Sequence, residues 1–191
     1  MEPPPFPAGL TLTPTKPADN PVVADLMTRA HPDWARTAAD LDRFDEMRLA
    51  GEVFERVLAR RGGEPVGMAE VSRPRMDGHP GWLNLEVMTL ERPLFGPLLA
   101  WAEATAAQHQ ARTLVTRVKE NWWEREAFGA AGYAEHDRMW TSVLDLTTLA
   151  FSTFAPQEAR ARASGVTLHP LSDLGPYDEA QQRKLYDLIA A

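Results

Sequence analysis

The stretch WLNLEVMTL, residues 82–90, has the alternating pattern of a β-strand, in which successive side chains point to opposite faces of a sheet. Residues 94–110 follow, with leucines, a tryptophan and alanines at helical spacing, and residues 113–119 again have a strand pattern. A strand, a helix and a second strand in this order predict a right-handed crossover between parallel strands. This crossover decides the fold, because the helix must cover one face of the sheet.

The segments before and after the crossover are expected to complete the same sheet. We expect further strands over residues 10–13, 54–60, 65–71 and 133–146, and helices over residues 19–30, 34–50 and 122–131. The two glycines between Arg61 and Glu64 predict a hairpin between the second and third strands. The expected class is α/β, with a mixed sheet in the order β-α-α-β-β-β-α-β-α-β and helices on both faces.

A short motif occurs twice, as GLTLTP at residues 9–14 and as GVTLHP at residues 165–170. A repeat at the length of a whole domain indicates duplication. We therefore expect a disordered proline-rich tail over residues 1–8, a complete domain over 9–146, a helical connector over 147–164, and the first strand and helix of a truncated second domain over 165–191. An orphaned strand of this kind could pair with a second copy of the chain, which makes a homodimer possible.

Composition and charge exclude several classes of function. The chain has 191 residues and no cysteine, so disulfides, thiolate nucleophiles and cysteine-based metal sites are excluded. The five histidines show no metal-ligand spacing, and we interpret them as surface or loop residues. The net charge of −7 argues against a nucleic-acid partner. We expect a cytoplasmic protein without a membrane segment, because the chain has no long apolar run and no secretory signal.

The order of the expected elements resembles the GNAT superfamily of acyl-CoA-dependent N-acetyltransferases over about residues 10–146. Residues 121–133, which end in Gly-Tyr, resemble the closing motif of that family, and residues 83–110 lie where its acyl-CoA-binding strand, loop and helix would be. Residues 140–146 and 183–188 resemble the domain junction of tandem two-domain GNAT proteins. The resemblance implies transfer of an acetyl group from acetyl-CoA to a primary amine on a small molecule or peptide.

In this family a loop of the pattern R/Q-x-x-G-x-G/A brings backbone N–H groups close to the pyrophosphate of the cofactor. The matching stretch here is ERPLFGPLL, in which Pro93 and Phe95 occupy the two glycine positions. Pro93 and Pro97 have no N–H to donate, so only Arg92 and Gly96 keep part of the expected chemistry. We favour the simpler interpretation of Pro93 as a proline in the first turn of a helix.

The resemblance assigns binding of the acyl donor to Met88, Thr89, Arg92, Phe95, Gly96 and Asn121. Strand amides near Met88 and Thr89 would bind the pantetheine arm and polarise the thioester carbonyl. Asn121 would contact the same arm, or it is only the N-cap of the following helix, which is our first expectation.

Glu86 is the candidate general base, because it lies on the strand beside the expected acyl site and faces away from Leu85 and Val87. A solvated or hydrogen-bonded strand carboxylate is an equally good interpretation. Phe128 stands where many family members have a tyrosine that protonates the leaving thiolate; it lacks the hydroxyl, and we interpret it as a core residue. The lost glycines and the missing tyrosine leave a second hypothesis open, a catalytically silent scaffold for an active partner domain.

Overall fold

The computed structural model describes residues 6–74, 79–140, 145, 147–148, 150–167, 180 and 183. The chain forms two compact units, Met1–Glu135 and His136–Ala191, and the sheet belongs to the first of them. In the described parts of the chain, no helix is both long and apolar enough to cross a lipid bilayer.

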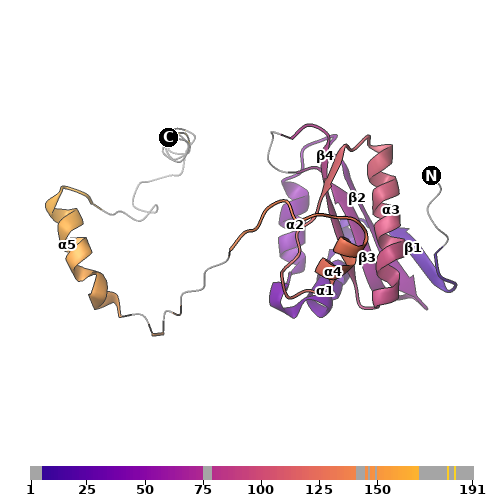
Figure 1. The fold of residues 1–191 in the computed structure, drawn as a ribbon, viewed down its shortest axis with the longest axis horizontal. Coiled ribbons are helices and arrows are strands. Elements are labelled where there is room, and N and C mark those ends of the chain that lie inside the picture. Colours follow the sequence, from indigo (N-terminus) through magenta and orange to yellow (C-terminus); the bar gives the residue numbers. More distant parts are fainter. Residues whose placement is uncertain are drawn as a thin grey trace. The chain divides into compact units, whose positions relative to one another are not determined.

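The first unit contains one five-stranded sheet in the order β1-β2-β3-β4-β5 (Figure 1). Its strands are β1 (Leu10–Pro14), β2 (Phe54–Arg61), β3 (Glu64–Ser72), β4 (Trp82–Thr89) and β5 (Thr113–Val115). The first four strands pair antiparallel and β4 pairs parallel with β5, so the crossover predicted from the sequence is confirmed.

Helices cover both faces of this sheet, as predicted (Figure 1). The helices of the first unit are α1 (Asn20–Ala30), α2 (Ala38–Glu46), α3 (Phe95–Gln108) and α4 (Glu124–Ala130). Three short 3-10 helices precede α1, α2 and α3, namely η1 (Pro17–Asp19), η2 (Pro32–Trp34) and η3 (Arg92–Leu94). Both α1 and α2 pack on one face, whereas α3 and Phe128 of α4 pack on the other.

Each face of the sheet has its own apolar core. On the α3 face, the buried strand residues are Val57, Ala59, Ala69, Val71, Leu83, Leu85 and Val87. On the α1 face, Leu58, Met68 and Met88 pack against Val23, Leu26 and Met27. Burying each of these larger side chains contributes about 1.5–3 kcal/mol, so the two cores hold the helices at fixed positions over the strands.

The last predicted strand is not formed in the part of it that the structure describes. Residues 134–140 have no regular structure, whereas a strand was expected over 133–146, and residues 141–144 and 146 lie outside the described part. The neighbouring strand β5 is only three residues long and offers few backbone groups for pairing. The edge that a further strand would need is therefore short.

The second helix is shorter than predicted, because its start signal lies inside the expected range of 34–50. The Thr37 hydroxyl accepts a hydrogen bond from the Asp40 N–H (3.2 Å), and the Asp40 carboxylate accepts one from the Thr37 N–H (3.0 Å). This capping box satisfies two backbone donors and fixes the first residue of α2 at Ala38.

The second unit contains η4 (Phe151–Phe154) and α5 (Ala155–Ala163), within the connector expected from the sequence. Gly9 and Gly165, which open the two copies of the repeat, both have left-handed backbones, with φ of 80° and 81°. The strand expected in the second copy corresponds to residues 166–169; residues 166 and 167 have no regular structure, and residues 168 and 169 lie outside the described residues. The truncated second domain therefore stays a prediction.

Gly67 on β3 lies close to α3 and to the neighbouring strand β4. A Cβ atom there would lie 2.8 Å from Cδ1 of Leu98, 3.1 Å from Oγ1 of Thr89 and 3.2 Å from the Met88 carbonyl oxygen. Leu98 is fully buried and cannot move aside. We expect Gly67→Ala to lower the free energy of unfolding by about 1–3 kcal/mol through overpacking, measured as a lower urea midpoint with an unchanged slope.

Gly129→Ala in α4 is the matched control, because a Cβ there would meet no atom within 4 Å. It should leave stability unchanged or raise it by up to about 1 kcal/mol, since alanine is the better helix former. An equal loss of stability in both variants would contradict the close approach at Gly67.

Candidate functional site

The parallel pairing between β4 and β5 ends early. Only Trp82, Leu83 and Asn84 pair with β5, whereas β4 continues to Thr89. The two strands are therefore hydrogen-bonded to each other only along the first part of β4. We call residues Leu85–Thr89, on the side of β4 away from β3, the open edge of β4. Among the described residues no strand pairs with this edge.

The backbone alternation decides which groups face the open edge. The Leu90 N–H donates to the Val66 carbonyl oxygen on the β3 side (2.9 Å). In an antiparallel pair every second residue bonds to the same neighbour, so the N–H of Met88 also points to β3. The N–H and C=O groups of Val87 and Thr89 point the other way, toward the open edge. The Met88 side chain is buried against α1. Val87 and Thr89 are therefore better candidates than Met88 for backbone hydrogen bonds to a ligand at the open edge.

Glu86 lies on the α1 face of β4, beside two charged residues of the neighbouring strands. Glu86 pairs in register with Glu70 on β3, and Glu70 pairs with Arg56 on β2. Nε and Nη2 of Arg56 both lie 2.7 Å from Oε2 of Glu70. We call Arg56, Glu70 and Glu86 the charged row. Each of the three lies two residues along its strand from Leu58, Met68 or Met88 and therefore on the same face of the sheet.

The charged row perturbs the ionisation of Glu86. Burial, with the Glu70 carboxylate adding to it, raises the pKa of Glu86 to about 7 against the opposing effects of Arg56 and Arg36. Loss of hydration disfavours the charged carboxylate, and a like charge on the next strand does the same. A carboxyl group that ionises near neutral pH can both accept and release a proton under ordinary conditions.

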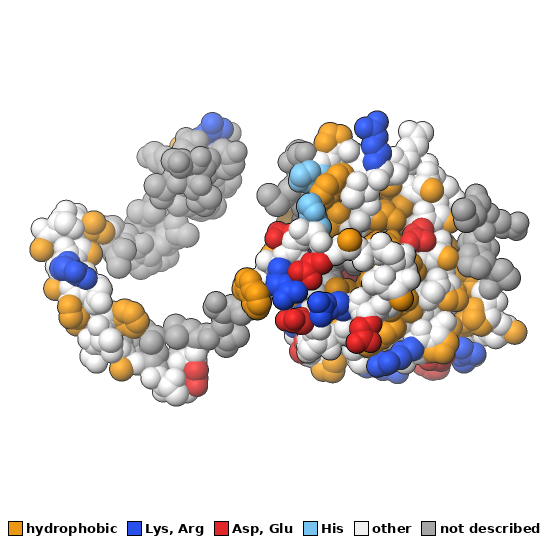
Figure 2. Space-filling model, viewed as in Figure 1, with side chains coloured by type: hydrophobic (Ala, Val, Ile, Leu, Met, Phe, Trp, Pro, Cys, Tyr) orange, Lys and Arg blue, Asp and Glu red, His pale blue; other side chains and the backbone are white. Residues whose placement is uncertain are grey.

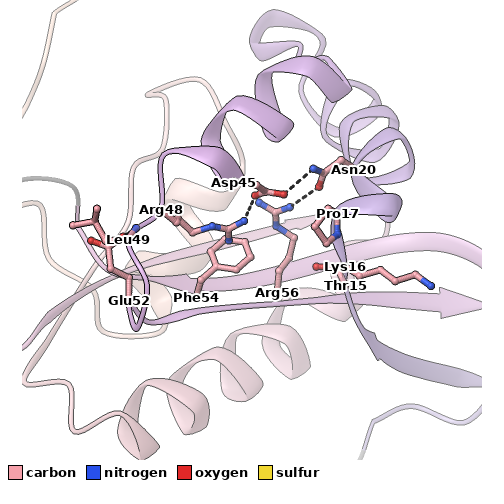
Figure 3. Close-up of a pocket in the computed structure, with 10 residues that line it drawn as sticks. All are labelled: Thr15, Lys16, Pro17, Asn20, Asp45, Arg48, Leu49, Glu52, Phe54 and Arg56. Carbon is pink, nitrogen blue, oxygen red and sulfur yellow. Dashed lines mark hydrogen bonds and ion pairs between the residues drawn. The ribbon is translucent and has the colours of Figure 1, made fainter.

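An open pocket of about 280 Å³ begins at Arg56 and extends away from Glu86. Figure 3 shows Arg48 stacked on the ring of Phe54, beside Arg56 and Asn20. Asn20 is fully buried and donates to Asp42 and Asp45 at 2.8 Å, and Asp45 also pairs with Arg48. The charges lining the pocket are thus largely matched among themselves.

The loop between β4 and α3 has few free N–H groups. The N–H of Glu91 donates to Oγ1 of Thr89 (3.0 Å), that of Leu94 to the Glu91 carbonyl oxygen (2.9 Å), and that of Phe95 to the carbonyl oxygen of Arg92. Pro93 lies in the first turn of η3, as predicted, and has no N–H. The residues present do not form the backbone cradle that a pyrophosphate needs.

The other donor-site candidates of this loop have separate positions. Phe95 is buried, with its ring edge-to-face against Phe128 (4.9 Å between centroids) and Trp123 (5.5 Å). The Arg92 guanidinium lies over the Trp123 ring, 5.2 Å from its centroid. Gly96 is exposed, and a Cβ there would meet no atom within 4 Å. Phe95 thus serves packing, and the surface at Gly96 is open.

Asn121 is not the N-cap of the following helix, contrary to our first expectation. Helix α4 begins at Glu124, and Trp123 occupies the N-cap position. Asn121 is exposed, two residues before that cap, because a turn over residues 120–123 delays the start of the helix. Its side chain has no packing role and lies in the segment between β5 and α4.

Phe128 is a core residue, as predicted, and Tyr133 does not replace the missing hydroxyl. Phe128 is 3% exposed. The Tyr133 hydroxyl donates to Oε1 of Glu103 on α3 (3.1 Å). Burial, with the Glu103 carboxylate adding to it, raises the pKa of Tyr133 above its ordinary value, so the phenol is held in its protonated, hydrogen-bonded form.

A group of residues that the sequence analysis did not single out joins the end of α1 to the segment before α4. His31, expected at the surface, is buried; its Nε2 lies 3.1 Å from Oε1 of the buried Glu124, and its ring stacks on Trp122 at 3.6 Å. Trp122 donates to Asp33 (3.2 Å), and Lys119 donates to the same carboxylate (2.9 Å). We call these five residues the clasp.

The clasp contains a second perturbed carboxyl group. Burial raises the pKa of Glu124, against the opposing effects of its own backbone, of His31 and of Arg92. Neither carboxylate oxygen of Glu124 has an aligned hydrogen-bond partner. By contrast, the hydrogen bond from Lys119 lowers the pKa of the exposed Asp33. No local sequence signal marks the contacts of Asp33 with Lys119 and Trp122, because these partners are about ninety residues apart in the sequence.

Charge on the surface is intermixed rather than segregated. Figure 2 shows basic and acidic side chains side by side on the face that it presents. In the described residues, no group of three or more histidine, aspartate and glutamate side chains could hold a metal ion. The local arrangement at β4, rather than a long-range field, is therefore the distinguishing chemical feature.

The fold is shared with solved N-acetyltransferases. An aminoglycoside N-acetyltransferase in complex with the bisubstrate analogue CoA-S-monomethyl-acetylneamine matches 71% of this chain and 98% of its own, with 18% identity and a TM-score of 0.53. A GCN5-related N-acetyltransferase from Ralstonia eutropha matches 71% and 99%, with 18% identity and a TM-score of 0.54. An acetyltransferase from Trypanosoma brucei matches 71% and 99%, with 16% identity and a TM-score of 0.53.

No protein-family model matches the chain, and no curated protein matches its sequence. At identities below one fifth, the structural matches show the fold. The predicted GNAT architecture is therefore confirmed, while the activity has to be argued from the residues of this chain.

The raised pKa of Glu86 makes the stability of the fold depend on pH. The unfolded chain releases this proton near the ordinary value of 4.5 and the folded chain near 7, so stability falls as pH rises between these values. From that shift we expect a loss of roughly 3 kcal/mol that is complete above neutral pH. Glu86→Gln should lack this loss and be more stable than the wild type at about pH 8, by urea unfolding.

At about pH 4, below both pKa values, the two proteins should be nearly equal in stability. A stability difference that is the same at both pH values would contradict the titration of Glu86 and would point to altered packing instead.

Proposed function

We propose that this protein transfers an acyl group, by preference acetyl, from acyl-CoA to a primary amine of a small molecule or peptide. One observation carries the proposal: β4 parts from β5 after Asn84, and Glu86, two residues further along, ionises near neutral pH. The fold shared with N-acetyltransferases supports it.

Acetyl-CoA would supply an acyl group activated as a thioester. The N–H and C=O groups of Val87 and Thr89 at the open edge of β4 are suited to hold the amide-containing pantetheine arm as a substitute strand. Of the two strand candidates, Thr89 directs its backbone groups to this edge, whereas Met88 directs its own to β3. An N–H directed at the thioester oxygen would stabilise the negative charge that develops there. Asn121 lies in the segment that follows β5 and could contact the same arm.

Glu86 would accept the proton of the attacking amine, directly or through water. A primary ammonium cannot attack until it loses a proton, and a carboxylate on the same face of β4 provides an acceptor. The new C–N bond forms as the C–S bond breaks, and the proton finally leaves with the thiol. Because Phe128 has no hydroxyl, this last proton must come through solvent or from Glu86 itself.

The phosphate end of the donor is recognised only weakly in this proposal. Pro93 and Pro97 have no N–H, and the N–H groups of Glu91, Leu94 and Phe95 are used within the chain. Arg92 and the open surface at Gly96 are the groups left for the pyrophosphate. These features of the loop are consistent with a degraded form of the cradle. The protein would then bind the donor mainly through its pantetheine arm.

Acetyl-CoA and S-acetyl-pantetheine should therefore bind with affinities that differ by less than about tenfold, since Arg92 is exposed and a surface ion pair contributes only about 0–1 kcal/mol. Isothermal titration of both donors measures this ratio. Binding of acetyl-CoA more than about a hundredfold tighter, a gap of about 2.8 kcal/mol, would contradict the degraded loop.

Glu86→Gln should lower kcat/KM for acetyl transfer by about 10²–10⁴-fold at neutral pH, the usual range for a general base. The matched control is Glu55→Gln, which removes an exposed carboxylate from the opposite face of β2. Release of free thiol from acetyl-CoA in the presence of a panel of primary amines measures the rate. Equal activity in wild type and Glu86→Gln would remove Glu86 from the mechanism.

A second candidate function is favoured by the same loop. Prolines at the cradle and phenylalanine at position 128 are consistent with a silent scaffold that supports an active domain, and the repeat at residues 165–170 is consistent with a tandem arrangement. Thermal unfolding with added acetyl-CoA separates the two, because a ligand of the folded state must raise the melting temperature. No shift at millimolar acetyl-CoA would support the scaffold.

A further inference from the structure

The charged row crosses three strands on the face of the sheet that α1 covers. Arg56 pairs with Glu70 across β2 and β3, and Glu70 pairs with Glu86 across β3 and β4. Paired residues on neighbouring strands project to the same face, with strands about 4.8 Å apart. The three side chains therefore follow one another in the order cation, anion, anion.

One guanidinium has to serve two carboxylates in this row. Arg56 directs Nε and Nη2 at the same oxygen of Glu70, and its Nη1 makes a longer contact of 3.4 Å with Asn20. The Arg56 and Glu70 side chains are 6% and 13% exposed, so this pair is held away from water. Arg56 is thus paired with Glu70. Glu86, on the other side of Glu70, lies beside a carboxylate and not beside a cation.

One further charged group, Arg36, acts on Glu86 and opposes the rise of its pKa. The Arg36 guanidinium stacks on Trp34 (5.0 Å) and Phe44 (5.7 Å) at the start of α2. The residues of α1 that face this part of the sheet, Val23 and Met27 among them, are apolar. Glu70, Arg56 and Arg36 are therefore the charged groups that act on Glu86.

We propose that Glu70 and Arg56 are positioning residues for Glu86, and that their ion pair sets the pH at which Glu86 accepts a proton. The pair fixes a negative charge beside Glu86 that neither rotates away nor is screened by water. Two contacts from Arg56 to one oxygen of Glu70 hold that carboxylate in place. The catalytic consequence rests on the proposed function, whereas the effect on the protonation of Glu86 does not.

The two partners have opposite effects, which gives a sharp test. In Glu70→Gln the repulsion disappears and Arg56 is left to attract Glu86, so Glu86 should ionise at least about one pH unit lower. In Arg56→Gln the attraction disappears while Glu70 stays, so Glu86 should ionise at a higher pH than in the wild type. If the pair only supported the packing of the site, both variants would disturb that packing and shift the titration of Glu86 in the same direction.

Carbon-13 NMR of the side-chain carboxyl groups follows the titration directly, with the Glu86 resonance identified by its absence in Glu86→Gln. Glu55→Gln is the matched control, since Glu55 is next to Arg56 on β2 but faces the opposite side and pairs with His109. It should leave the titration of Glu86 unchanged. Shifts of the same sign in the two row variants, or none, would overturn the proposal.

Removing one member of a buried ion pair can prevent folding. The double variant Arg56→Gln with Glu70→Gln avoids an unpaired charge and serves as the second test. Because Glu70 acts on Glu86 more strongly than Arg56 does, the double variant should titrate below the wild type but above Glu70→Gln. A titration identical to the wild type would overturn the proposal.

The pH profile of kcat/KM separates this proposal from the proposed function. If acyl transfer is found, its acidic limb should move down in Glu70→Gln and up in Arg56→Gln, in step with the NMR titration. Opposite NMR shifts in a protein without acyl transfer would support the control of Glu86 by Arg56 and Glu70 and would contradict the proposed function. Activity that needs Glu86 but has the same pH profile in all variants would support the proposed function and contradict that control.

Discussion

The early end of the ladder between β4 and β5 is the constraint on which the rest of the first unit depends. Three residue pairs hold these parallel strands together, and beyond them, within the described parts of the chain, β4 has a strand partner on its β3 side only. The backbone groups of Val87 and Thr89 then need other partners, because backbone donors and acceptors that lose water without a partner cost free energy. An extended molecule with amide groups would satisfy them in the same way as a strand does.

The two ends of this candidate site differ in how well they are built. At the reacting end, the open edge of β4 and the Glu86 carboxyl lie on the same strand, within a face otherwise filled by Leu58, Met68 and Met88. In the loop before α3, Pro93 has no N–H, and the N–H groups of Glu91, Leu94 and Phe95 donate within the chain. Under the proposed function, the extended arm of the donor would therefore contribute more to binding than its phosphates.

Much of the fold could be predicted from local patterns, because those patterns depend on near neighbours. The alternation of residues 82–90 correctly predicted a strand and the face of Glu86, and the missing hydroxyl of Phe128 correctly pointed to a core residue. The start of α2 was also encoded locally, in Thr37 and Asp40, and could have been recognised as a capping box. The partners of Glu86 were not encoded in this way, because a bulge between Ala59 and Arg60 shifts the register set by the hairpin and pairs Arg56 with Glu70 instead of Ala69.

Other features could not be predicted, because they depend on contacts between distant parts of the chain. Residues 133–140 carry an alternating pattern but form no strand, and the shortness of the neighbouring edge at β5 appears only in three dimensions. His31 has no sequence feature that marks it as buried, since Trp122 and Glu124 reach it from the other end of the domain. Whether the Glu86 carboxyl is solvated likewise depends on the packing of α1 over the sheet.

The clasp has a consequence for how the domain assembles. Trp122 and Asp33 are 89 positions apart in sequence, and one belongs to the segment after β5 while the other follows α1. These contacts close a long loop of the chain, which costs conformational entropy. The indole stacked on His31 changes its surroundings when the segment after α1 separates from the segment before α4, so its fluorescence reports on the closure of this loop.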